Sequence, residues 1–251
     1  MKCFFAGLTD PGLVRSVNQD AYYLHPEGRY FIVADGMGGH AGGQEASNIA
    51  TKAIQAYLNE HWDSPETSPA LLEQAFLEAN REILTDQNSH PERSDMGTTA
   101  VVLIFRNDQP WCAHIGDSRL YRLRGSKLEQ ITEDHTWVAR AMKVGDLTLD
   151  QARVHPWRHI LSKCLGREDL RCIDVQAVDI QPNDRLLLCS DGLTEELSDH
   201  LIAFHVKSIR SCEKAASALV TAARDKGGRD NITVVIAAVT APQNQVDAAQ
   251  G

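Results

Sequence analysis

Four acidic residues stand at the ends of apolar segments that are far apart in the chain. Asp35 follows FIVA, Asp117 follows WCAHIG, Asp191 comes after LLLCS, and Asp230 comes just before NITVVIAAV. Carboxylates that gather in one place repel each other and raise one another's pKa unless a cation neutralises them. Oxygen ligands without a His or Cys cluster favour Mg²⁺ or Mn²⁺ over zinc. If these segment ends meet, two such ions could activate a water for hydrolysis. The alternative is four unrelated turns.

A phosphate substrate would need a cationic partner beside these carboxylates. Arg15 is the best candidate, because a guanidinium group matches phosphate oxygens in a bidentate manner. It lies five residues before Asp20, in a segment with few other charges. Taken alone, an arginine in such a place is more often a surface ion-pair partner, so its role depends on whether the acids converge.

The stretch YFIVADGMGGHAGG, residues 30–43, positions the first of these acids. Its apolar run predicts a buried strand that ends at Asp35-Gly36. Five glycines within eight residues let other atoms approach this backbone closely. A helix is predicted from about Gln44 to about His61. The stretch also fits the loose dinucleotide pattern Gly-x-Gly-x-x-Gly/Ala, but the second strand that should end in an acid about 20 residues later is missing.

The remaining segments predict strands clustered in hairpins, with helices in pairs between them. From Gly97, TTAVVLIF, WCAHIG, RLYRLR and KLEQIT follow one another with connections too short for parallel crossovers, which predicts an antiparallel meander. Arg119, Arg122 and Arg124 alternate along it and are expected on a solvated face. Helices are predicted from about Thr194 and at about 213–226. This order favours an α+β fold with antiparallel sheets covered by helices.

Length and composition limit the class of protein. The 251 residues have a formal net charge of -9, which argues against nucleic-acid binding. No apolar run approaches ~18 residues and no signal peptide is evident, so no membrane association and a cytoplasmic location are expected. The six cysteines form no Cys-x-x-Cys pair, as is typical of reduced, buried thiols. No cysteine has an arginine six positions later, which excludes a cysteine-nucleophile phosphatase. A single domain over 1–240 and a disordered tail over 241–251 are expected.

Six segments of the sequence resemble the metal-dependent serine/threonine protein phosphatases of type 2C, the PPM family. They are RSVNQDA (15–21), VADGMGGHAGG (33–43), MGTTAVV (96–102), AHIGDSRLYRLR (113–124), LLLCSDGLTEELSD (186–199) and GGRDNITVVI (227–236). They occur in the family's order and cover nearly the whole chain. The resemblance implies a four-layer α-β-β-α sandwich, in which two central antiparallel sheets are flanked by helices and the metals lie in the cleft between the sheets.

The resemblance also implies roles for individual residues. Two to three Mg²⁺ or Mn²⁺ ions would be held by the metal ligands Asp35, Gly36, Asp117, Asp191 and Asp230. Asp35 would bridge two ions, the Gly36 carbonyl would reach the second, and Asp117 with Asp191 would hold a third. Arg15 would bind the substrate phosphate and Asp20 would hydrogen-bond metal-bound water. A bridging hydroxide would attack phosphorus in line, without a phosphoenzyme. A mobile substrate-recognition flap is expected at about 143–164.

Two departures from the family pattern concern the catalytic groups. Many members have a histidine directly after the Asp-Gly, thought to protonate the leaving oxygen, whereas here Met37 stands there and His40 comes three residues later. His40 is therefore only a candidate for this role. Position 19 is Gln where many relatives have Glu.

The expected partner is a phosphorylated protein, and a monomer is expected. The segments HPWRHILSKCLG and SDGLTEEL are similar to a cyanobacterial family member that dephosphorylates the signalling protein PII, so PII is a candidate substrate. His159 of the first segment is a candidate substrate contact. The competing hypothesis is a catalytically inactive member that only binds phosphoproteins. An inactive member is expected to lack a metal-binding carboxylate, whereas Asp35, Asp191 and Asp230 are all present.

Overall fold

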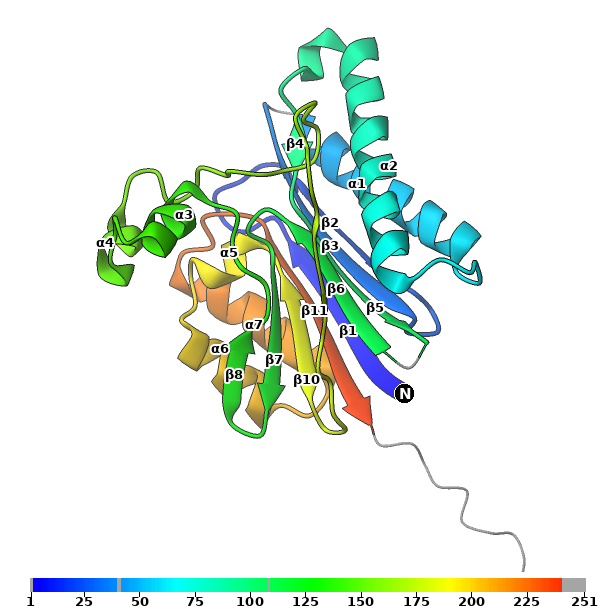
Figure 1. Ribbon diagram of the computed structural model, residues 1–251. Coiled ribbons are helices and arrows are strands. Elements are labelled where there is room, and N and C mark those ends of the chain that lie inside the picture. The colour runs from blue at the N-terminus through cyan, green and yellow to red at the C-terminus, as the bar shows by residue number, and fades with distance from the viewer. Residues whose placement is uncertain (1, 40–41, 108, 241–251) are drawn as a thin grey trace, which may run out of the picture.

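The protein is a sandwich of two antiparallel sheets with helices on both outer faces (Figure 1). The computed structural model describes residues 2–39, 42–107 and 109–240. The predicted α+β fold with four α-β-β-α layers is confirmed. The tail predicted over 241–251 and the candidate His40 lie outside the described residues.

The first sheet has the strand order β1-β11-β10-β7-β8, and the second has the order β2-β3-β5-β6-β9, with the short β4 paired to β3. The strands of the first sheet are β1 (Lys2–Asp10), β11 (Ile232–Thr240), β10 (Arg185–Cys189), β7 (Arg119–Arg124) and β8 (Lys127–Gln130). Those of the second are β2 (Asp20–Leu24), β3 (Tyr30–Met37), β4 (Gly97–Thr98), β5 (Ala100–Arg106), β6 (Gln109–Ile115) and β9 (Asp174–Ala177).

Helices cover each sheet on its outer side. The second sheet carries α1 (Gly42–His61) and α2 (Ser68–Ser89), followed by the short 3-10 helix Pro91–Arg93. The first sheet carries α5 (Asp191–Thr194), α6 (Asp199–Ser208) and α7 (Cys212–Lys226). Two short helices, α3 (Trp137–Val144) and α4 (Leu149–Val154), project at one end of the sandwich, at the left of Figure 1. None of the helices in the described ranges combines the length and apolar character needed to cross a bilayer.

The apolar strands are buried on both faces, which explains why they read as continuous hydrophobic runs. In β3, Phe31 and Val33 belong to the core between the sheets, whereas Tyr30 and Ile32 pack under α1 and α2. Successive side chains of a strand point to opposite faces. A strand covered on both sides therefore needs apolar residues at every position, a pattern more familiar from parallel sheets.

Two expectations about element boundaries were wrong. Asp35-Gly36 does not end its strand, because β3 continues to Met37, where Gly36 pairs with Thr98 and Met37 with Gly97 of β4. The helix expected from Thr194 is instead two helices, α5 and α6. The chain breaks between them at Ser198, whose backbone is extended (φ -68°, ψ 155°) and which stands at the N-cap of α6.

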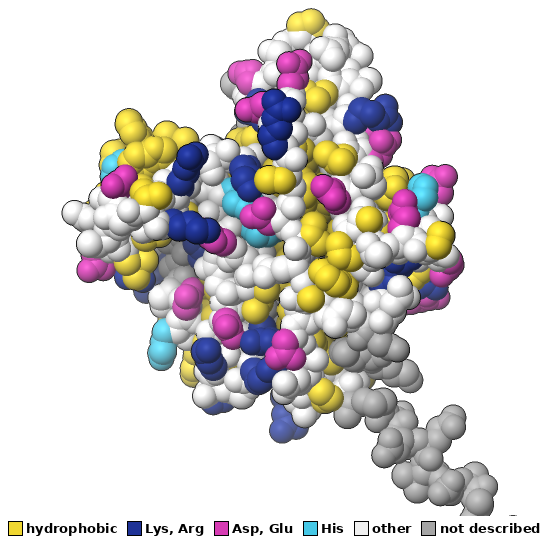
Figure 2. All heavy atoms as spheres, viewed as in Figure 1, with side chains coloured by type: hydrophobic (Ala, Val, Ile, Leu, Met, Phe, Trp, Pro, Cys, Tyr) yellow, Lys and Arg dark blue, Asp and Glu magenta, His cyan; other side chains and the backbone are white. Residues whose placement is uncertain are grey.

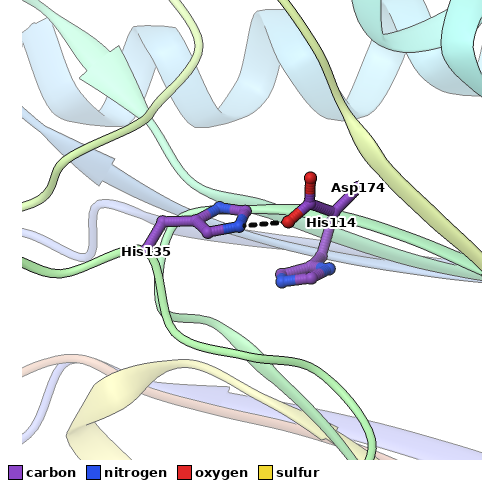
Figure 3. Close-up of side chains that lie close together, drawn as sticks. All are labelled: His114, His135 and Asp174. Carbon is purple, nitrogen blue, oxygen red and sulfur yellow. Dashed lines mark hydrogen bonds and ion pairs between the residues drawn. The ribbon is translucent and has the colours of Figure 1, made fainter. Parts of the chain in front are cut away.

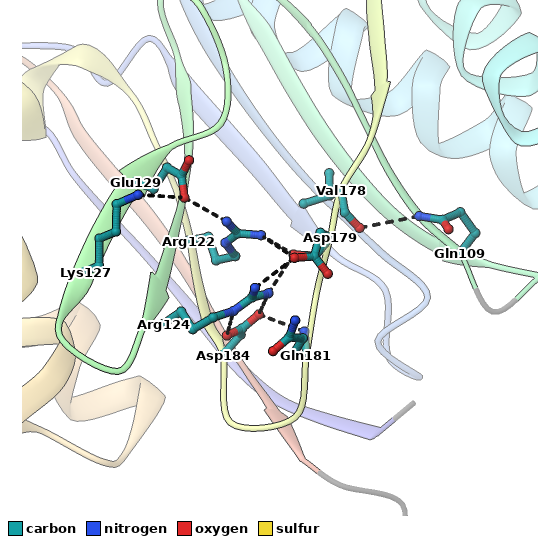
Figure 4. A network of polar contacts seen from close by, with 9 residues as sticks. All are labelled: Gln109, Arg122, Arg124, Lys127, Glu129, Val178, Asp179, Gln181 and Asp184. Atoms are coloured by element: carbon teal, nitrogen blue, oxygen red, sulfur yellow. Dashed lines mark hydrogen bonds and ion pairs between the residues drawn. The ribbon is translucent and has the colours of Figure 1, made fainter.

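The arginines of β7 are not a solvated face, as their alternation had suggested. Arg124 binds both carboxylate oxygens of the buried Asp184, at 2.9 and 2.7 Å, and Arg122 binds Glu129 at 2.7 Å. Both arginines also contact Asp179 (Figure 4). Asp179 and Asp184 lie in the connection from β9 to β10, which passes from one sheet to the other. The network therefore ties this crossing segment to the β7–β8 hairpin.

Candidate active site

Acidic residues from both sheets converge at one end of the sandwich. Asp20 on β2 lies directly opposite Asp35 on β3 in the strand register. Asp191 begins α5 straight after β10, and Asp230 comes just before β11, the neighbour of β10 in the first sheet. The carboxylates of Asp20, Asp117, Asp191 and Asp230 each raise the pKa of Asp35, so the cluster acts as one electrostatic unit.

The glycines that follow two of these acids allow the backbones to approach. A Cβ on Gly36 would lie 1.9 Å from the Gly43 carbonyl oxygen, and one on Gly192 would lie 2.1 Å from the Asn231 carbonyl oxygen. Neither position can hold a larger residue without displacing backbone. Gly192 thereby lets the segment of Asp191 pack against the segment of Asp230. Gly43 likewise allows a close approach of two backbone segments, because a Cβ at residue 43 would lie 2.8 Å from the Gly36 carbonyl oxygen.

Asp20 is a buried carboxylate with one satisfied and one unsatisfied oxygen. Its side chain is held by the hydroxyls of Ser190 and Thr233, which donate to Oδ2 at 2.7 and 2.6 Å. Oδ1 has no hydrogen-bond partner among the described residues. Burial raises the pKa of Asp20 to about 6, against the effect of the two hydroxyl hydrogen bonds. A buried acceptor without a donor is costly, so Oδ1 needs a ligand or a proton.

Three further acids have raised pKa values. Burial, then the charge of Asp20, raises the pKa of Asp35 well above its usual range. Burial and the charge of Asp117 do the same to the pKa of Asp191. Burial, then the charge of Asp134, raises the pKa of Asp117 to about 7. These side chains are partly reachable from solvent, yet they sit deep among protein atoms and beside one another. At neutral pH the cluster requires bound protons or bound cations.

The cluster fits divalent ions that prefer oxygen. Its donors are carboxylates and, by sequence, the Gly36 carbonyl, which are the ligands typical of Mg²⁺ and Mn²⁺. The unsatisfied Oδ1 of Asp20 and the mutually raised pKa values are the signs expected of a site built around positive charge. The residues present therefore fit the ions.

Arg15 lies at the exposed side of the cluster. Its Nη2 donates to Oδ2 of Asp230 at 2.7 Å, and the arginine side chain is 52% exposed. This hydrogen bond, followed by the charge of Asp230, raises the pKa of Arg15, and Asp35 and Asp191 contribute. The guanidinium thus lies within the field of the acids and is reachable from solvent.

A cleft connects the acids to the projecting helices. It has a volume of about 1340 Å³, and its lining includes Asp117 and Asp191 on one side and residues of α3 and α4 on the other. His159, which follows α4, reaches across: its Nδ1 is 2.5 Å from Oε1 of Glu195. One ligand atom each from His159, Asp191 and Glu195 lies within 4.8 Å of the others. The candidate substrate contact therefore lies beside the acidic cluster.

The sequence interpretation missed several residues that hold the acids in place. Thr99 accepts the Asp35 backbone N–H at 3.0 Å, and Asn231 accepts the Gln19 backbone N–H at 2.7 Å. Ser190 and Thr233 hold Asp20, as described above. The sequence carries no signal for these contacts, because each of the four residues is far along the chain from the residue that it holds.

The departure from the family at position 19 has a structural role here. The Gln19 side-chain amide donates to the Gly38 carbonyl at 3.2 Å and thereby holds the glycine-rich loop. Met37, in the place of the usual histidine, ends β3 in a half-buried position.

Comparisons with known proteins agree with this geometry. The family model of protein phosphatase 2C matches residues 14–224. The serine/threonine phosphatase stp of Listeria monocytogenes is 36% identical over 233 residues, which cover 91% of this chain and 92% of that protein. PstP of Mycobacterium tuberculosis is 36% identical over 239 residues, 94% of this chain and 45% of that protein.

Solved structures give the same result. A crystal structure of the M. tuberculosis serine/threonine phosphatase PstP/Ppp superposes with a TM-score of 0.86 at 35% identity, over 95% of this chain and 99% of that one. The catalytic domain of PstP in complex with two manganese ions superposes with a TM-score of 0.84 at 33% identity, over 95% and 99% of the two chains. The chain belongs to the protein phosphatase 2C family of metal-dependent serine/threonine phosphatases.

Proposed function

We propose that this chain hydrolyses phosphoserine and phosphothreonine esters of proteins at the acidic cluster, in bacterial signalling. The observation that carries the proposal is the convergence of carboxylates from both sheets beside the accessible guanidinium of Arg15. In the reaction, a water oxygen bonds to phosphorus in line with the ester bond that breaks. The protein hydroxyl leaves with a proton, and phosphate is released.

In this proposal Asp35, Gly36, Asp191 and Asp230 would hold two Mg²⁺ or Mn²⁺ ions, and Asp117 with Asp191 would hold a third. Support comes from the PstP catalytic domain, which was crystallised with two manganese ions, and from the oxygen-only donor set. When bound, the ions would supply Lewis-acid activation of a water near neutral pH and neutralise charge at the phosphoryl oxygens.

The other residues act on the substrate and on protons. Arg15 would bind the phosphoryl oxygens, because its guanidinium is half exposed beside the acids and can donate two parallel hydrogen bonds. Asp20 has an Oδ1 without a partner among the described residues, so this oxygen can accept a hydrogen bond from the attacking water. On sequence grounds alone, we keep His40 as a proposed proton donor to the leaving oxygen.

For the substrate, we propose a phosphorylated protein that the flap, residues 143–164, helps to select. Exposed hydrophobic side chains gather over this region (Figure 2), including Val144, Leu149, Val154, Trp157 and Ile160. His159 stands between this surface and the acids. Phosphorylated PII is the narrower candidate, supported by the residue pattern of HPWRHILSKCLG and SDGLTEEL. The enzyme is proposed to act as a monomer, because one chain supplies every residue of the site.

A phosphatase assay tests the proposal. With Mn²⁺, the protein should release phosphate from a phosphothreonine peptide and from phosphorylated PII, and Asp35→Asn should abolish release from both. Activity that survives this substitution would refute the site. Faster turnover of the peptide than of phosphorylated PII would refute PII as the preferred substrate and leave the general activity standing. An inactive, phosphoprotein-binding member has no support, since no carboxylate of the proposed set is missing.

A further inference from the structure

A second cavity shares His159 with the cleft described above. It has a volume of about 500 Å³ and is lined by part of the segment between α4 and β9, together with Met37 of β3. Its lining carries fixed positive charges at Lys163, Arg167 and Arg171, and Asp169 is the one acid among the described lining residues. This cavity, here called the basic pocket, therefore differs in charge from the acidic cluster.

Two lining residues place the basic pocket directly beside the acidic cluster. Met37 follows Asp35 by two residues in β3, which corresponds to about 7 Å along a strand. A ring nitrogen of His159 lies within 4.8 Å of a carboxylate oxygen of Asp191. An extended peptide advances about 3.3–3.6 Å per residue, so a residue within about three positions of a phosphorylated residue in the cluster can reach the pocket.

The wall of the basic pocket is held by the core of the protein. Leu165 is fully buried and exchanges two backbone hydrogen bonds with Thr98 of β4, at 2.9 and 3.2 Å. The Asn80 side chain on α2 accepts the backbone N–H groups of Gly166 and Arg167, at 2.7 and 3.1 Å. In Figure 1 this segment runs from α4 to β4 and from there to β9. The backbone that carries Arg167 is therefore fixed without a bound substrate.

The two arginines are the cations of the pocket that have no carboxylate partner. Lys163 donates to Oδ1 of Asp174 at 3.3 Å. The other oxygen of this carboxylate accepts from Nε2 of His135 at 2.7 Å (Figure 3). Within the described ranges, neither Arg167 nor Arg171 forms an ion pair with an acidic residue. Two guanidinium groups of the lining are therefore available to an anion from outside the chain.

We propose that the basic pocket binds an anionic side chain close to the phosphorylated residue of the substrate. This inference rests on the proposed phosphatase activity. It narrows the substrate class to phosphoproteins with an acidic or a second phosphorylated residue within about three positions of the ester that is hydrolysed. A guanidinium group can donate two parallel hydrogen bonds to a carboxylate or to a phosphate, so Arg167 and Arg171 suit either group.

The overall charge of the chain explains why such a pocket is needed. The formal net charge of -9 disfavours the approach of acidic substrates at long range. Recognition of an anionic residue therefore requires positive groups at short range, where hydrogen bonds add to the charge interaction. The basic pocket supplies them next to the point where the phosphorylated residue would bind.

Phosphothreonine peptides that differ in one flanking residue test this proposal. The flanking residue is Glu, Gln or the non-hydrolysable phosphonate analogue of phosphoserine, placed before or after the phosphothreonine. With Mn²⁺, the kcat/KM for the Glu peptide should exceed that for the Gln peptide about fivefold or more on one of the two sides. This ratio should fall as salt is added, because salt screens exposed charges. A phosphonate peptide better than the Glu peptide would identify doubly phosphorylated proteins as the preferred source of the anion, and the reverse order would identify acidic sequences.

Substitution of the arginines should remove the preference. Arg171→Gln should lower the ratio of the Glu to the Gln peptide, and the double variant Arg167→Gln, Arg171→Gln should bring it close to one. Arg171 is exposed, so its single variant decides the question if loss of Arg167 disturbs the fold. Arg140→Gln is the matched control, because Arg140 is an exposed arginine of α3 that lines neither cavity, and this variant should keep the ratio of the parent protein.

The hydrolysis of a small aryl phosphate separates this proposal from the proposed function, because that reaction needs the acidic cluster and no flanking residue. A ratio close to one in the parent protein, or an unchanged ratio in the double variant, would overturn the basic pocket as a binding site while aryl phosphate is still hydrolysed. A parent protein that hydrolyses neither aryl phosphate nor any peptide would refute both proposals.

Discussion

Asp20→Asn should stabilise the metal-free protein at neutral pH. Asp20 is 8% exposed, and its pKa is raised from 3.8 to about 6. Since the folded-state pKa lies above the unfolded value, the folded protein binds more protons between about pH 4 and pH 6, and stability falls as pH rises through this window. Above about pH 6 the full cost is present, and a rise in pKa of this size corresponds to about 3 kcal/mol.

The amide can replace the carboxylate without loss of its contacts. Its oxygen can accept from Ser190 and Thr233, as Oδ2 does now. Its NH2 group would then take the place of the unpaired Oδ1, where it can donate to Asp35 across the strand pair. The substitution thus removes a buried charge and adds a donor, and it should weaken Mn²⁺ binding at the same time.

Urea unfolding in excess chelator measures the effect. At about pH 8 the variant should be more stable than the parent by about 3 kcal/mol, and near pH 4 the two should be equal. Asp184→Asn is the control, because Asp184 is also buried but is paired with Arg124. That variant should be destabilised at neutral pH. If Asp20→Asn is destabilised at pH 8, or if the difference does not depend on pH, the electrostatic account of the cluster is wrong.

Three further substitutions test the site. Gly192→Ala, whose Cβ would lie 2.1 Å from the Asn231 carbonyl oxygen, should cost about 1–3 kcal/mol of stability and weaken Mn²⁺ binding; an unchanged melting temperature and metal titration would contradict this. Arg15→Ala should raise the KM for a phosphopeptide about tenfold or more through lost charged hydrogen bonds, without weakening Mn²⁺ binding, because the guanidinium competes for Asp230; weaker metal binding in a Mn²⁺ titration would speak against this role. His159→Ala should lower the kcat/KM for a phosphoprotein more than that for a small aryl phosphate, and equal losses would exclude a recognition role.

Much of the architecture could be predicted from the sequence, because its causes are local. Short connections after Gly97 require antiparallel pairing, and apolar runs such as FIVA require burial on both faces. The extension of β3 past Asp35 could not be predicted, since it depends on pairing with the two residues of β4, which lie about 60 positions away. The pairing of Arg124 with Asp184 likewise arises where a segment crosses between the sheets.

The acids of the candidate site could be recognised by their places at strand ends, but their supports could not. Ser190 and Thr233 reach Asp20 only because β10 and β11 of one sheet meet β2 of the other. Sequence spacing can indicate which residues could be catalytic or bind metals, whereas contacts between the sheets decide which of them form a common site.

The acidic cluster takes Asp20 and Asp35 from one sheet and Asp191 and Asp230 from the ends of two interior strands, β10 and β11, of the other. Mutual repulsion among these side chains therefore pushes the two layers apart whenever divalent ions are scarce. The same ion supply should then limit both the turnover rate of the enzyme and the time that the folded chain survives proteases. Magnesium starvation would shorten the lifetime of the protein as well as its catalytic output.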